Sequence, residues 1–133
     1  VDNAVINPAD HYCYKGMMLS GLPNFVLSMG YTNASWTLKS DLVSEYVCRI
    51  LKHMDKQQHD FFMPALPTTP LDDEPIVDFS SGYITRALKM MPKQAKQKPW
   101  KLRQNYILDR ITLGYTSLND DCMTFNKRDA KPA

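Results

Sequence analysis

Glycine is scarce in this sequence, and its five residues never form a phosphate-binding loop. Phosphate and dinucleotide loops need closely spaced glycines, so that the backbone can approach the ligand. No serine lies in a GxSxG turn either, which excludes the nucleophile elbow of the α/β-hydrolases. We therefore predict no catalytic residue and no self-contained catalytic constellation in this chain.

Cysteine is also sparse, and its pattern excludes two common uses of this residue. Cys13, Cys48 and Cys122 are odd in number and widely spaced, without a CxxC pair. This spacing argues against a disulfide framework or a zinc site, so we predict no bound metal. Reduced thiols are typical of a cytoplasmic protein, and we expect that location.

Long apolar runs are absent, and no basic n-region with an apolar core opens the sequence, so neither a membrane helix nor a signal peptide is predicted. The formal net charge of +2 is too small to indicate a polyanionic partner, and no nucleic-acid partner is expected. Because the first residue is Val1 rather than Met, we expect the chain to be part of a longer protein.

What is present is the composition of a globular domain, with 44% hydrophobic and 23% charged residues. The clearest helix carries an apolar stripe at three- and four-residue steps, Val43, Tyr46, Val47, Ile50, Leu51 and Met54. Its N-cap is expected within "TNAS", residues 32–35. Phe25–Met29 is expected to be a buried strand that ends at Gly30. Strand, turn and helix together would form half of a βαβ unit.

The remainder of the chain is expected to be a linker and a helical extension. Residues 61–79 include "MPALPTTPLDDEP", which predicts a proline-rich acidic surface linker after a first unit of residues 1–60. Residues 80–126 predict two further helices, the first stopped by Pro92 and the second running from Pro99 to about Leu113, with Gly114 as its C-cap. A turn at Asn119–Asp120 and a short strand follow, and 127–133 is expected to be a frayed tail.

The segment from Arg86 to Arg103 is basic, contains no acidic residue and lies close to Trp100 and Tyr106. Such a pattern can bind nucleic acid or acidic lipid, which suggests an alternative function as a non-enzymatic interaction module. A solvated basic face anchored by an aromatic side chain is the interpretation that we favour, because the charge of the whole chain is close to neutral. Acidic residues at 72–74 and 78 would partly neutralise such a face.

The stretch "GYTNASWTLKSD", residues 30–41, places a glycine turn directly before the capped helix. Two interpretations stay open at this point. The stretch is either an ordinary strand–helix junction or a ligand site, because a helix N-terminus offers unpaired N–H groups and partial positive charge.

Three strings resemble a known family: "YKGMMLSGLPNF", "GYTNASWTLKSDLVSEYVCRIL" and "SGYITRALKMMPKQAKQKPWKLRQNYILD". They resemble the C-terminal part of bacterial FAD-dependent, NADPH-using monooxygenases of the Baeyer–Villiger type, the group that includes the mycobacterial ethionamide-activating enzyme. The resemblance covers residues 10–126. It implies an enzyme in which a C4a-peroxyflavin oxygenates a ketone or a sulfide with molecular oxygen.

The resemblance also implies a fold and a site. The chain would be an α+β fragment, comprising the last strand–helix unit of a Rossmann-like FAD domain, two further helices and short strands. The helix N-terminus would face the electron-rich pyrimidine edge of the flavin. The implied cofactor-binding residues are Gly30, Thr32, Asn33, Ala34 and Ser35, and the residues bordering the substrate pocket are Trp36 and Thr37.

The family's two GxGxxG loops, its fingerprint and its catalytic arginine are missing from this chain. The family also often has glycine after "PKQ", where this chain has Ala95. The resemblance thus implies a partner, the N-terminal part of the same protein, and a chain that is inactive alone. The faces that would meet this partner predict self-association of the isolated chain, or its origin by proteolysis.

Overall fold

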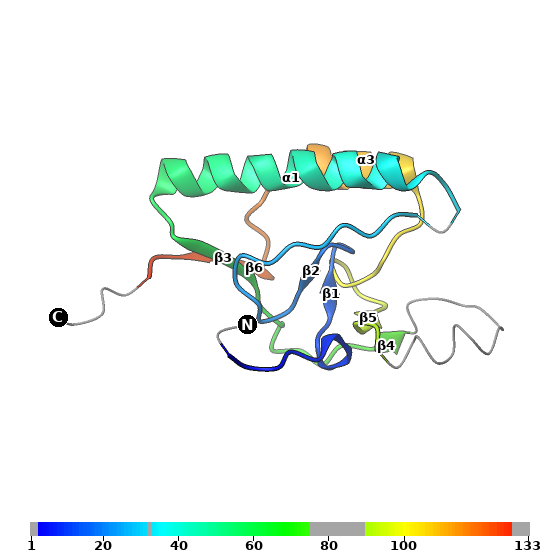
Figure 1. Cartoon of the computed structure of the whole chain (residues 1–133), viewed down its shortest axis with the longest axis horizontal. Coiled ribbons are helices and arrows are strands. Elements are labelled where there is room, and N and C mark those ends of the chain that lie inside the picture. The colour runs from blue at the N-terminus through cyan, green and yellow to red at the C-terminus, as the bar shows by residue number, and fades with distance from the viewer. Residues whose placement is uncertain (1–2, 32, 75–89, 129–133) are drawn as a thin grey trace.

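The computed structural model describes residues 3–31, 33–74 and 90–128. One long helix and one short helix lie side by side along one side of the molecule, and three small antiparallel sheets lie beneath them (Figure 1). The helices are α1 (Trp36–Gln57) and α3 (Tyr106–Gly114), which pack against each other. Neither is long and apolar enough to cross a membrane, within the part of the chain described.

The sheets each contain two short strands, and two of them join distant parts of the sequence. The sheets are β1 (Cys13–Tyr14) with β2 (Met18–Leu19), β3 (Phe61–Pro64) with β6 (Met123–Asn126), and β4 (Asp73–Glu74) with β5 (Gln94–Ala95). A short 3₁₀ helix, η1 (Pro8–Asp10), precedes β1. The β3–β6 pairing ties the end of α1 to the C-terminal region.

Helix α1 has the expected amphipathic pattern. Ser35 is its N-cap, within the predicted stretch, and Gln58 ends it in a left-handed conformation. Val43, Tyr46, Ile50 and Met54 are buried as expected, whereas Leu51 is half exposed. The inward stripe therefore confirms the predicted face, and Leu51 lies at its edge.

Two further expectations, one about a strand and one about a helix, are wrong or only partly right. Phe25–Met29 is not in a strand; Leu27 N–H donates to the Met17 carbonyl at 2.8 Å, and the segment runs as irregular backbone toward α1. The third helix begins at Tyr106 rather than Pro99, because the Asn105 side chain caps it by accepting from the Leu108 N–H.

The predicted linker of residues 61–79 is structured at its start. Phe61–Pro64 form β3, with Phe62 and Pro64 buried, because the predicted final strand β6 pairs with this segment. The sequence could not show this pairing across about sixty residues. The predicted second helix, with its cap at Ser80 or Ser81, lies almost wholly outside the described residues, as does most of the predicted tail.

The core lies between α1 and the sheets. Buried side chains from α1, β1, β2 and the segment before α3 meet there, including Tyr14, Met18, Tyr46 and Trp100. Trp100 is fully buried and contacts Tyr14 edge-on, with ring centroids 5.6 Å apart. The indole is therefore unavailable to stack on a nucleic-acid base, whereas Lys96, Lys98 and Lys101 nearby are exposed.

Candidate functional site

The N-terminus of α1 is open to solvent. Residues 33–37 are exposed, and the Ser35 side chain makes no capping hydrogen bond to the helix. Its hydroxyl instead pairs with the Thr37 hydroxyl, at 2.7 Å between oxygens. Because the first N–H groups of a helix have no intrahelical acceptor, this terminus presents donors and partial positive charge outward.

Gly30 and Trp36 shape the turn that leads into α1. A Cβ atom at Gly30 would clash with the Trp36 ring and with its Cβ. The glycine thus allows the indole to lie directly over the backbone, although 66% of the Trp36 side chain stays exposed. The close contact with Trp36 is enough to require glycine at position 30, so the glycine by itself is no evidence for a ligand.

The remaining predicted site residues lie along the same turn. The Asn33 side-chain amide donates to the Gln104 carbonyl at 3.1 Å, which ties the turn to the segment before α3. Ala34 is exposed. Thr32 lies outside the described residues. The structure therefore brings Gly30, Asn33 and the start of α1 together at one exposed corner.

A buried polar network, not foreseen from the sequence, supports this corner. Lys39 Nζ lies 2.6 Å from Asp109 Oδ2, and the Tyr31 hydroxyl donates to the same oxygen at 2.8 Å. Lys39 is 2% exposed and Asp109 is 5% exposed. Burial, with the hydrogen bond to Asp109, raises the pKa of Tyr31 above its usual range. The network joins the turn, α1 and α3 one helical turn from the exposed N-terminus.

The sequence did contain a signal for this network. Lys39 falls four residues before Val43, on the apolar stripe of α1, and Asp109 falls four residues before Leu113 on the buried face of α3. Opposite charges on the inward faces of two helices have to be paired in the interior. Which two residues meet was visible only in the structure.

Comparison with curated proteins shows that the chain is similar, over nearly its whole length, to part of several FAD-containing monooxygenases. This finding confirms the resemblance that the three sequence strings indicated. The chain is 42% identical over 130 residues to the FAD-containing monooxygenase EthA of Mycobacterium tuberculosis (strain ATCC 25618 / H37Rv), which covers 98% of this chain.

Two further relatives agree with this result. The chain is 45% identical over 117 residues to the FAD-containing monooxygenase EthA of Mycolicibacterium smegmatis, covering 88% of this chain and 24% of that protein. It is 42% identical over 134 residues to the probable FAD-binding monooxygenase AlmA of Acinetobacter sp, and the match covers 100% of this chain and 27% of that protein. The chain thus spans about a quarter of the length of the curated relatives it matches. No family model and no solved structure match it.

Proposed function

We propose that this chain is the C-terminal segment of a flavoprotein monooxygenase and that the N-terminus of α1 forms one wall of the FAD site. One observation carries the proposal: the helix has 22 residues, and its exposed first turn has no side-chain cap. The homology to FAD-containing monooxygenases supplies the electron-rich partner that such a terminus would stabilise.

The residues of the corner fit a flavin edge. The N–H groups of Trp36, Thr37 and Leu38, in the first turn, would donate to the electron-rich oxygen and nitrogen of the pyrimidine ring. When bound, the flavin supplies the oxygen-activating redox chemistry. Asn33, Ala34 and Ser35 would line the cofactor, and Trp36 and Thr37 would border the substrate.

The buried network gives this wall its rigidity. Electrostatic stabilisation is strongest when the donors are already oriented before charge develops. The Lys39–Asp109 pair and the Tyr31 hydroxyl hold the turn and the first turns of α1 to α3. The helix dipole would therefore point at a fixed position in the flavin site.

The finer features of the proposal concern the whole enzyme. They are NADPH as the reductant, a small ketone or sulfide as the substrate, molecular oxygen as the co-substrate and a cytoplasmic location. The other walls of the site, with the dinucleotide-binding loops, would come from the N-terminal part of the same protein. A Rossmann-like context for the turn and α1 belongs to the same proposal.

The experiment uses Ser35→Asp in the full-length protein, because this change acts in opposite directions on the fold and on the flavin. Aspartate is a favourable N-cap and should stabilise α1 by a few tenths of a kcal/mol to about 1 kcal/mol. The same negative charge should disfavour reduced flavin by about 1–2 kcal/mol, equivalent to roughly 20–40 mV for a two-electron couple.

The matched control is Ser44→Asp, which adds the same charge at an exposed position of the same helix. Nine residues separate the two sites, or about 13 Å along the helix axis. We expect a lower flavin midpoint potential for Ser35→Asp only, with an unchanged or raised Tm. Equal midpoint potentials for Ser35→Asp, Ser44→Asp and the wild type would refute the proposed wall.

A further inference from the structure

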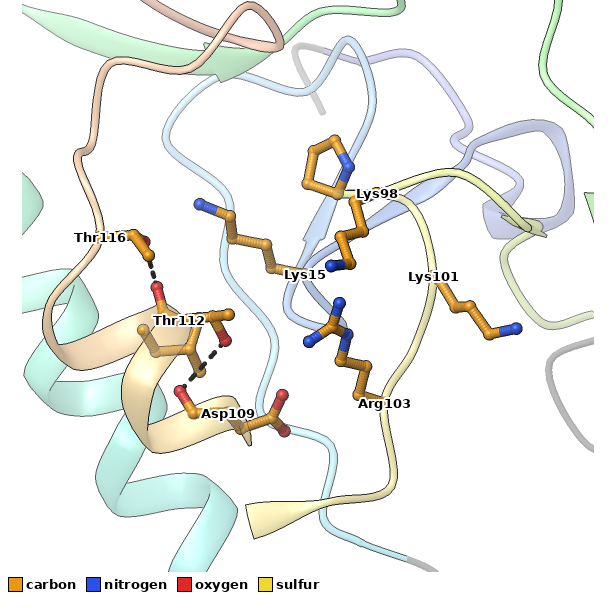
Figure 2. A pocket seen from close by; sticks show the side chains of 9 residues that line it. Lys15, Lys98, Lys101, Arg103, Asp109, Thr112 and Thr116 are labelled. Carbon is orange, nitrogen blue, oxygen red and sulfur yellow. Dashed lines mark hydrogen bonds between the residues drawn. The ribbon is translucent and has the colours of Figure 1, made fainter. Parts of the chain in front are cut away.

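A cavity of about 160 Å³ lies between Lys15, the segment 98–103 and α3 (Figure 2). A single water molecule needs about 10–15 Å³ measured in this way, so the cavity has room for a much larger group. Its charged lining residues are Lys15, Lys98, Lys101, Arg103 and Asp109. Four cations and one carboxylate thus surround one hollow, although the chain as a whole is nearly neutral.

Three of these five charges are balanced by identified partners. Lys15 Nζ lies 3.1 Å from Asp120 Oδ2, and Lys101 Nζ lies 3.2 Å from Glu74 Oε2. Asp109, the acidic group among the described lining residues, is paired with Lys39. Within residues 3–31, 33–74 and 90–128, neither Lys98 nor Arg103 has an acidic partner. Counting only the residues that the structure describes, the cavity therefore carries an excess of two positive charges.

The orientation of these two cations indicates what they would bind. In Figure 2 the Lys98 ammonium and the Arg103 guanidinium point toward each other, whereas the Lys101 ammonium points away from them. Two like charges that converge repel each other, and an anion between them replaces this repulsion by attraction. Arginine offers a planar fork of N–H donors and lysine a compact point charge, and both suit phosphate oxygens.

The two threonine hydroxyl groups of the cavity are not available as hydrogen-bond donors to an anion. Thr112 Oγ1 donates to the Leu108 carbonyl at 2.9 Å, and the Thr116 hydroxyl donates to the Thr112 carbonyl. Each hydroxyl has a single proton, so neither has a proton left for an anion. Recognition would therefore depend on the charged side chains.

We propose that this cavity binds a phosphate group, held between Lys98 and Arg103. A phosphate carries up to two negative charges at neutral pH, which matches the two uncompensated cations. The proposal is independent of the flavin wall, because none of the residues it uses belongs to the exposed turn of α1. The phosphate would be either inorganic or part of a nucleotide.

The test is isothermal titration calorimetry on the purified full-length protein. The probes are inorganic phosphate, pyrophosphate and 2′-phospho-ADP-ribose. Arg103→Met should weaken binding roughly 10- to 100-fold, as expected for loss of hydrogen bonds to a charged group. Lys98→Met should weaken it several-fold, and Arg103→Lys should retain part of the affinity.

Lys101→Met is the matched control, because it removes the same charge from the same segment but from a side chain that points away. We expect the affinity of Lys101→Met to stay within about twofold of the wild type, since the Lys101 ammonium is already paired with Glu74 and points away from Lys98 and Arg103. Circular dichroism checks the fold; if Arg103→Met is unfolded, the exposed Lys98→Met decides the test.

Two results would identify the source of the phosphate. Only binding that Arg103→Met weakens is assigned to the cavity, because the dinucleotide-binding loops of the N-terminal part would also bind a nucleotide. For that binding, a higher affinity for 2′-phospho-ADP-ribose than for phosphate would assign the cavity to a nucleotide, and equal affinities would assign it to the free anion. The proposal is overturned if Arg103→Met and Lys98→Met leave the affinity for every probe unchanged, or if Lys101→Met weakens binding as much as Lys98→Met.

Discussion

Breaking the ion pair between Lys39 and Asp109 should destabilise the protein strongly. The pair is short, at 2.6 Å, and its side chains are only 2% and 7% exposed. In Lys39→Met, Asp109 would stay buried with the Tyr31 hydroxyl as its remaining identified partner. Removing one member of a buried pair costs about 3–5 kcal/mol, a large share of the roughly 5–15 kcal/mol that stabilises a typical domain.

Removing both charges should cost much less than removing one. In Lys39→Met/Asp109→Leu, apolar groups replace the pair, a change that is often neutral. The Tyr31 hydroxyl would then lack its acceptor, at a cost of about 1–3 kcal/mol, so Tyr31→Phe is added to the double variant. We expect this triple variant to recover most of the stability that the single variant loses.

The assay is urea unfolding followed by far-ultraviolet circular dichroism. Glu45→Gln serves as the control, because Glu45 and Arg110 join the same two helices as an exposed pair at 3.7 Å. An exposed pair contributes about 0.2–1 kcal/mol. If Lys39→Met costs no more than Glu45→Gln, the buried pair does not hold α1 and α3 together and the reasoning fails.

Two other predictions test the turn and a buried thiol. Gly30→Ala should lower the free energy of unfolding, measured in urea, by about 1–3 kcal/mol, because the added Cβ meets the Trp36 ring. Adding Trp36→Ala should remove most of that loss. A Gly30→Ala variant as stable as the wild type would show that packing against Trp36 is not the reason for glycine at this position. Burial raises the pKa of Cys13 from 9.0 to about 11. The folded protein therefore keeps a proton that the unfolded chain releases. The protonated Cys13 thiol therefore contributes roughly 2–3 kcal/mol to the free energy of unfolding below pH 9, and this contribution is lost as the pH rises to 11. The stability of Cys13→Ala should fall less steeply over that range, and an identical slope would contradict the assignment.

Local patterns in the sequence were enough for some features of the fold. The position and inward face of α1 followed from the spacing of Val43, Tyr46, Ile50 and Met54, because a helix brings residues three and four apart onto one side. The strand near the C-terminus was also correct, but the turn before it lies at Asp121–Cys122 rather than at Asn119–Asp120, because the Met123 N–H bonds the Asp120 carbonyl. Phe25–Met29 was misread, because apolar composition alone does not provide the partner that a strand requires.

The sequence by itself indicated the similarity to FAD-containing monooxygenases and the long helix with the turn at its start, because each is carried by residues adjacent in the chain. Only the tertiary structure paired Lys39 with Asp109, 70 residues away, and gathered Lys15, Lys98 and Arg103 around one cavity. Charge pairing depends on distances of a few ångströms between residues far apart in sequence. Those distances are set by the packing of the whole chain, which no local pattern encodes.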